Sequence, residues 1–381
     1  MDVHGGKGIS LGPNNYLGRA WIAAPIAITV EGANILPRSL IIYGQGASRC
    51  HPFVLRELAA AGDEDIDRGL IEFDDALFGH IGYAISNVAR SFFLALTHAK
   101  FSSVPLNTPT RRYYQNINRY SAAFALASDF AMLTLGGDLK KRELLSARLG
   151  DVLSSIYLAS CVLKHFENQG RRATDLPLVE WSIRTLMYQA QEALHSFLRN
   201  LPNRWAATFL RIFIFPRGRT YSAPSDELVH KVVELATTPG EARERLSQQA
   251  YTTTEPGNPI GLLEEALQLS IELAPLERRL RQAYKEGLIR SEYLGEQIGE
   301  AASAEIINKD EAAKLRDYHE KVFSLLSVDD FAPEDLRRTT GRQADEPSPK
   351  PAKKAAKRKQ APRKKVSGKK KVSSKKKTEA E

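Results

Sequence analysis

The chain has 381 residues, of which 43% are hydrophobic and 26% are charged, which is enough for two compact domains with sizeable cores. Its formal net charge of +9 is unevenly distributed, because residues 350–377 contain 13 Lys and 2 Arg and no acidic residue. Residues 1–349 contain 39 basic and 43 acidic residues and are therefore mildly acidic. This composition excludes a wholly nucleic-acid-binding chain, a collagen-like chain and a wholly disordered one.

The cysteine content and the N-terminus indicate the compartment. Cys50 and Cys161 are too few for a disulfide scaffold or a cysteine-built zinc site, and they favour the reducing cytoplasm. The first residues lack the basic region and apolar core of a signal peptide. The longest apolar stretch, Trp21 to Val30, has 10 residues and is too short to span a bilayer. We therefore expect a cytoplasmic protein.

The spacing of apolar residues predicts an all-α helical bundle. Residues 1–14 are rich in Gly, Pro and Asn and are predicted to form a loop. No alternating strand of useful length and no fixed-period repeat follows. Helices are expected at residues 15–28, 34–46, 51–61, 74–96 and 108–135. The next helix follows a cap at Asp138, and another starts at Asp175. The last helices are expected at about 203–214, 225–237, 240–249, 259–286, 291–307 and 309–326.

Two of these helices carry core-facing stripes, and two more carry candidate caps. The helix after Asp138 has apolar residues at 145, 149, 152, 156, 163 and 166, the period of a helix that packs on one face. The helix after Asp175 continues the pattern at 179, 183, 186, 190, 194, 197 and 201. Ser291 and Asn308 are candidate N-caps for the last two helices.

The predicted domains are residues 1–100, residues 101–335 and a tail at residues 340–381. The first two are expected to be packed helical parts of one bundle. The tail is rich in Lys, Ala, Pro and Ser. It cannot bury enough apolar surface to offset its ordering entropy, and its like charges repel, so we expect it to be disordered.

Two features near the N-terminus could carry chemistry. The run His4-Gly-Gly-Lys-Gly8 brings backbone amides close together, and Gly5 and Gly6 would let a phosphate approach them, although the spacing by itself favours a flexible N-terminal turn. Glu31 follows an apolar stretch and precedes Gly32. A carboxylate in a dry pocket there would have a raised pKa suited to a general base, whereas a helix–helix turn would leave it in solvent.

Other polar residues give weaker signals. Arg38 and Arg49 could each pair with a phosphate or a carboxylate, or form ordinary surface ion pairs. The eight His residues show no metal-ligand spacing, so the sequence predicts no metal site. His4, His51 and His80 could reach a site, with a structural role as the alternative for each.

Several segments together resemble a known family. The segments are Asp2-Val-His-Gly-Gly-Lys-Gly-Ile9, Ile28-Thr-Val-Glu-Gly-Ala-Asn-Ile-Leu-Pro-Arg38, Tyr43-Gly-Gln-Gly-Ala-Ser-Arg-Cys-His-Pro52, and the stretch from Leu135-Gly-Gly-Asp138 to Arg148-Leu-Gly-Asp151. They resemble the C-terminal part of bacterial long-chain acyl-CoA dehydrogenases of fatty acid degradation, which carry an extra helical C-terminal domain. The resemblance covers roughly residues 1–335.

The resemblance implies an FAD-dependent α,β-dehydrogenation of fatty acyl-CoA to trans-2-enoyl-CoA in β-oxidation. Glu31 would be the catalytic base, and its backbone N–H would stabilise the thioester oxygen. Gly5 and Gly6 would approach the FAD pyrophosphate. The implied partners are a fatty acyl-CoA substrate, an electron-transfer flavoprotein as acceptor, and the flavin-binding domains or a second copy of the chain.

The chain also departs from the family. Ala33 and Ile35 stand where relatives often have polar residues near the flavin, and Pro37 has no N–H to donate. The family's N-terminal helical and middle β-domains would precede residue 1. We therefore expect this chain by itself to bind FAD poorly and to have little activity.

The basic tail, Lys350 to Lys377, is not explained by the resemblance. It would attract anionic polymers without sequence preference. Three interpretations remain open: a solvated extension, an electrostatic anchor to the anionic inner membrane, and association with nucleic acid. The alternative to a dehydrogenase is therefore a non-catalytic helical protein whose tail binds anionic membrane or nucleic acid.

Overall fold

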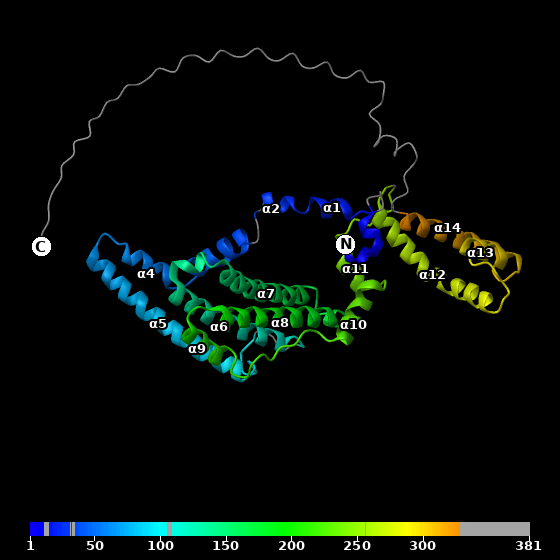
Figure 1. Ribbon diagram of the computed structural model, residues 1–381. Coiled ribbons are helices and arrows are strands. Elements are labelled where there is room, and N and C mark those ends of the chain that lie inside the picture. Colours follow the sequence, from blue (N-terminus) through cyan, green and yellow to red (C-terminus); the bar gives the residue numbers. More distant parts are fainter. Residues whose placement is uncertain (11–14, 31, 33–34, 105–108, 256, 328–381) are drawn as a thin grey trace, which may run out of the picture. The chain divides into compact units, whose positions relative to one another are not determined.

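The computed structural model describes residues 1–10, 15–30, 32, 35–104, 109–255 and 257–327. Regular structure in these residues is helical, without strands, which confirms the all-α prediction (Figure 1). Met1–Asp329 form one compact unit. The boundary predicted at residue 100 stays a prediction, and the tail at residues 340–381 lies outside the described residues.

The N-terminal elements differ from the expected loop and single helix. A 3₁₀ segment, η1 (Asp2–Ile9), occupies the predicted loop, and its two turns join at Gly5, whose φ of 57° only glycine adopts readily. The helix expected at 15–28 is divided into α1 (Gly18–Ala23) and α2 (Ile26–Val30) around Pro25, which has no N–H to donate. A π-helix, η2 (Ile35–Gln45), and the short α3 (Gly46–Arg49) follow.

The hairpin of α4 (Val54–Ala61) and α5 (Ile66–Leu96) brings the chain back along itself. The helix α5 begins eight residues earlier than predicted, because the Asp65 side chain caps it by accepting from the Arg68 N–H at 3.2 Å. Close packing needs a glycine on α5: a Cβ added at Gly79 would lie 2.4 Å from the Phe53 ring. Phe53 and the neighbouring His51 are thereby held against α5.

The main core is formed by α6 (Arg111–Leu135), α7 (Glu143–Asn168), α8 (Leu176–Asn200) and α9 (Arg204–Ile214). Figure 1 shows α6, α7 and α8 side by side. The predicted stripes are confirmed, since every stripe residue on α7 and α8 except Ile156 and Leu186 is buried, and those two pack partly buried against the core. Burial of a large aliphatic side chain contributes roughly 1.5–3 kcal/mol, so this face holds the bundle together.

The cap predictions had mixed outcomes. The helix start predicted at Asp175 is confirmed, although the Asp175 side chain makes no capping hydrogen bond and pairs with Arg245 instead. Asp138 does not cap α7: it lies in the 3₁₀ segment η3 (Gly136–Lys140), and Arg142 occupies the cap position. A second short 3₁₀ segment, η4 (Ala173–Asp175), precedes α8.

The helix α6 needs separate mention because its apolar composition was not singled out from the sequence. Residues Arg111–Lys140 are long and apolar enough to span a membrane by length and composition alone. However, α6 buries Gln115, Arg119 and Asp129 among neighbouring helices, with Arg119 only 2% exposed. Polar groups buried against protein are typical of a core helix.

The C-terminal part of the described chain contains α10 (Asp226–Thr237), α11 (Glu241–Ser247), α12 (Pro259–Lys285), α13 (Leu294–Ser303) and α14 (Lys309–Leu326). The last three share a second apolar core. Asn308 caps α14 in a reciprocal arrangement with Glu311, which confirms that prediction. Ser291 is not the cap of α13, because the helix begins after Tyr293.

Candidate functional site

Only some of the residues predicted to act in catalysis or cofactor binding are among the described residues. Glu31, the predicted base, lies outside the described residues, as does Ala33. Gly5 and Gly6 lie in η1, and a Cβ added at either would contact nothing within 4 Å. The backbone at these two glycines is therefore open to a ligand, and their role toward a cofactor stays a prediction.

The other candidates have identifiable surroundings. Arg38 Nη1 binds Asp151 Oδ1 at 2.5 Å, so this guanidinium forms an ordinary ion pair. Arg49 is exposed at the end of α3. His4 packs edge-on against Tyr16, with ring centroids 4.8 Å apart. His51 and His80, by contrast, lie together, with ring centroids 4.5 Å apart.

A cavity of about 390 Å³ is lined by His51, though not by His80, and is formed by η2, α3, α5, α6 and α7. Most of its walls are apolar, with a polar end formed by His51, Asp129, Ser128 and Tyr83. This size, apolar lining and convergence of a few polar groups are typical of ligand pockets. The apolar lining includes Ile42, Tyr43, Ala47, Phe124, Ala125, Met132 and Leu153.

The orientation of the His51 ring is fixed by the backbone. The N–H groups of Phe53 and Val54 donate to His51 Nδ1 at 3.2 and 3.1 Å, at the turn that begins α4. An Nδ1 that accepts two hydrogen bonds carries no proton, so the neutral ring is protonated at Nε2. Nε2 lies 3.0 Å from Asp129 Oδ1 and donates to it.

Asp129 is a carboxylate buried in the middle of α6. Its second oxygen accepts from Asn87 Nδ2 of α5 at 3.2 Å, and its side chain is 7% exposed. Burial raises the pKa of Asp129, while the bonds from Asn87 and His51 oppose that shift. Burial likewise lowers the pKa of His51, against the attraction of Asp129. The pair is therefore a desolvated but hydrogen-bonded polar group beside the cavity.

His80 completes this group from α5. Its Nδ1 lies 2.7 Å from Glu57 Oε1 of α4, which leaves Nε2 as the ring nitrogen without that partner. The ring stacks on Phe53 at 6.1 Å, and Tyr83 packs edge-on against His51 at 5.3 Å. We call His51, Glu57, His80, Asn87 and Asp129 the His51 cluster.

Tyr43 extends the polar surface of the cavity. Its hydroxyl donates to Ser128 Oγ at 3.3 Å, and the residue is 1% exposed. Burial raises the pKa of Tyr43 well above its ordinary value, so the phenol stays protonated at neutral pH. The group serves as a fixed hydrogen-bond donor.

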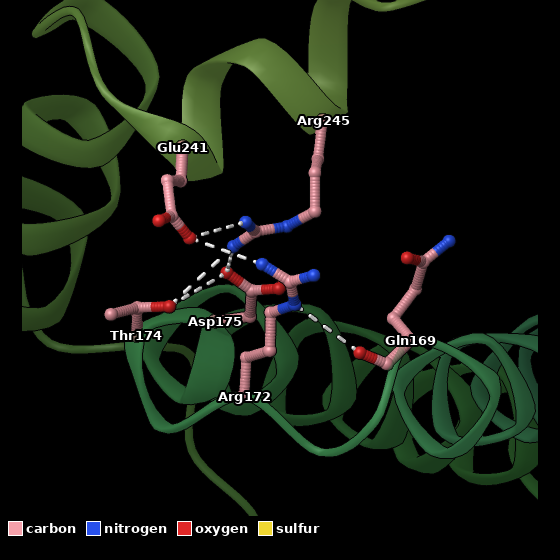
Figure 2. Close-up of polar contacts among 6 residues, drawn as sticks. All are labelled: Gln169, Arg172, Thr174, Asp175, Glu241 and Arg245. Atoms are coloured by element: carbon pink, nitrogen blue, oxygen red, sulfur yellow. Dashed lines mark hydrogen bonds and ion pairs between the residues drawn. The ribbon is translucent and has the colours of Figure 1, made fainter.

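A second polar region joins α11 to the start of α8, and Figure 2 shows its contacts. Arg245 Nη2 binds Asp175 Oδ1 at 2.5 Å, and Arg245 Nη1 and Arg172 Nη1 both reach Glu241 Oε2, at 3.3 and 3.1 Å. On the same helix, Arg243 forms a bidentate pair with Glu264 of α12 at 2.8 and 2.5 Å. We call these ion pairs the α11 network.

The α11 network is a structural connection. Its positive and negative groups pair with one another, and Glu241 is 78% exposed. Hollows of about 660 and 370 Å³ border the network. Neither brings together buried groups of the kind found at His51 and Asp129. The His51 cluster is therefore the better candidate for a functional site.

Sequence reasoning did not find the His51 cluster as a unit. Its members come from α4, α5, α6 and the turn before α4, and 78 residues separate His51 from Asp129. One signal was available: Asp129 interrupts an apolar stretch of α6, from Ala125 to Met132, where a charge needs a partner.

Comparison with known proteins identifies the family. Residues 48–331 match the family model described as acyl-CoA dehydrogenase, C-terminal, bacterial type. The match covers most of the chain, and the chain belongs to this family. No solved structure gives a significant match. The His51 cluster lies within the matched range, whereas Gly5, Gly6 and Glu31 precede it.

Proposed function

We propose that the chain is the C-terminal part of an FAD-dependent acyl-CoA dehydrogenase that converts fatty acyl-CoA to trans-2-enoyl-CoA in fatty acid β-oxidation. The observation that carries this proposal is the match of residues 48–331 to the bacterial-type C-terminal family. The segments around Gly5 and Glu31 support it, because they resemble the cofactor-binding and base-bearing parts of such enzymes.

The described residues that would approach the cofactor fit it. Gly5 has a positive φ, and neither Gly5 nor Gly6 has an atom where a Cβ would point. Their backbone N–H groups would hold the pyrophosphate by close approach, which a side chain at either position would hinder. When bound, FAD supplies the hydride acceptor of the reaction.

The proposed role of Glu31 is to remove the α-proton of the thioester. Its carboxylate would take the proton, and its backbone N–H would donate to the thioester oxygen as negative charge develops there. Preorganised donors of this kind contribute several kcal/mol, about 3–4 in one measured case, so a small displacement of this segment would lower turnover strongly. An electron-transfer flavoprotein is the proposed acceptor of the electrons.

The test uses the full chain purified from cells that produce it natively, so that associated flavin-binding segments are retained. We expect a visible flavin spectrum and dye reduction that depends on palmitoyl-CoA, with a product two hydrogens lighter by mass spectrometry. Free CoA, which has no α or β carbon, is the matched control. A preparation without flavin and without enoyl-CoA product would contradict the proposal.

A further inference from the structure

The His51 cluster, beside the polar end of the cavity, has the donor set of a metal site. His51, His80 and Asp129 each offer one ligand atom, and these atoms all lie within 4.8 Å of one another. Two imidazoles and one carboxylate are the ligands that Zn²⁺, Fe²⁺, Mn²⁺ and Co²⁺ accept. Mg²⁺ and Ca²⁺ prefer oxygen ligands throughout, so this set favours a transition metal.

A supporting contact already orients the His80 ring as a ligand. Glu57 holds His80 through Nδ1 at 2.7 Å, which is the carboxylate–histidine contact that fixes the tautomer of many metal-binding histidines. His51 Nδ1 accepts from two backbone N–H groups, so Nε2, which faces Asp129, carries the ring proton and must lose it before it can bind a metal. The His80 ring is therefore already oriented for a metal, whereas the His51 ring must first change its tautomer.

Hydrogen bonds also hold Asp129, the third proposed ligand. Asn87 binds one oxygen of Asp129, and the other oxygen lies 3.0 Å from His51 Nε2. The side chains of His51 and Asp129 are 5% and 7% exposed, so water competes weakly for them. His80 and Glu57 are about a quarter and a fifth exposed, which leaves a route from solvent.

We propose that His51, His80 and Asp129 bind one divalent first-row transition-metal ion, with an open coordination position facing the cavity. Three protein ligands and an accessible fourth position are the arrangement of catalytic rather than structural sites. The cavity beside His51 and Asp129 would admit a water molecule or an oxygen-bearing ligand to that position.

The distances between the three ligand atoms allow one metal ion to bind after small movements of the side chains. Metal–nitrogen and metal–oxygen bonds are about 2.0–2.2 Å, so two ligands of one ion are at most about 4.4 Å apart. The observed limit of 4.8 Å closes with shifts of a few tenths of an ångström per atom, through side-chain rotation. Binding at His51 Nε2 moves the ring proton to Nδ1 through solvent, so the ring stays neutral, and the hydrogen bonds that Nδ1 accepts from Phe53 and Val54 are broken.

The alternative is a cluster of hydrogen bonds that binds no ion. In that case Asp129 would remain the acceptor of His51, and His80 would serve only the contact between α4 and α5. The site also explains why the sequence predicts no metal: its ligands come from three separate segments and have no characteristic spacing.

The test is calorimetric titration of Zn²⁺ into the full, untagged chain after treatment with a chelator and buffer exchange. Co²⁺ titration, followed by its visible absorption, reports the coordination geometry. We expect one equivalent of Zn²⁺ to bind with a dissociation constant at or below the micromolar range, and a Co²⁺ spectrum typical of four or five ligands.

Variants assign the site. His80→Gln and Asp129→Asn should each weaken Zn²⁺ binding at least about 100-fold, and Glu57→Gln, which acts through His80, about 10–100-fold. His230→Gln, at an exposed histidine on α10, is the matched control and should bind as the native chain does. His80 is partly exposed, and circular dichroism checks that its variant is folded. The proposal is overturned if the native chain shows no saturable binding, or if folded His80→Gln binds with unchanged affinity.

Discussion

The His51 cluster and the α11 network both place basic side chains against acidic ones, yet they differ in burial and in charge state. The cluster buries a neutral imidazole and a carboxylate beside a cavity. Burial lowers the pKa of His51 and raises the pKa of Asp129, which favours the neutral form of each. The network pairs permanently charged arginines with carboxylates at helix ends, and Glu241 stays mostly in solvent. Similar residue types therefore serve a site in one region and a connection between helices in the other.

The difference predicts unequal costs of removing a carboxylate. Asp129→Ala would leave buried Asn87 and His51 donors without an acceptor, and we expect a loss of about 3 kcal/mol in the free energy of unfolding. Urea denaturation of the full chain, in buffer containing a chelator, measures this value independently of any metal.

The control for Asp129→Ala is Asp138→Ala, at an exposed carboxylate paired with Lys141. We expect a shift of about 0.5 kcal/mol or less there, as for most exposed surface positions. Equal losses for the two variants would show that the buried cluster is no more constrained than a surface ion pair, and would remove the contrast.

A smaller effect, with a defined pH dependence, is expected in the α11 network. The hydrogen bonds from Arg243 lower the pKa of Glu264 below its ordinary value. A depressed folded-state pKa stabilises the protein fully above the unfolded pKa of about 4.3, and this contribution is lost as the pH falls through the folded pKa. Glu264→Gln should therefore cost about 0.5–1 kcal/mol at neutral pH and almost nothing near pH 2.

Unfolding free energies of the native chain and Glu264→Gln, compared at the two pH values, test this prediction. Glu234→Gln, on the exposed side of α10, is the control and should show no pH-dependent difference. A cost for Glu264→Gln that persists in acid would mean that the pair stabilises the protein through packing rather than charge.

Local patterns predicted most of the helices but not the site. The stripes on α7 and α8 and the cap at Asn308 are set by neighbours along the chain, so the sequence contains the information directly. The start of α5 was missed because Asp65 caps a helix whose first two turns have exposed apolar residues, Ile66, Leu70 and Ile71. A loop was expected at residues 1–14, but Gly5, with its positive φ, joins two short 3₁₀ turns there.

The His51 cluster depends on tertiary contacts that no spacing rule contains. His51 reaches Asp129 only because the turn before α4 is held against α5 through Phe53 and Gly79. The predictions for Glu31, Gly5 and Gly6 had a different source, since they rest on likeness to a family rather than on contacts. They stay predictions, and measurements of flavin content and turnover are needed to test them.

Glu31→Gln tests the proposed dehydrogenase most directly. In the natively purified protein, this substitution removes the basic oxygen while preserving the shape of the side chain. We predict that flavin content and acyl-CoA binding are retained while turnover of palmitoyl-CoA falls by at least about 10³-fold, within the range for loss of a catalytic base. Glu64→Gln, at an exposed position, should leave turnover unchanged. Undiminished turnover in Glu31→Gln would contradict the assignment of this residue as the base.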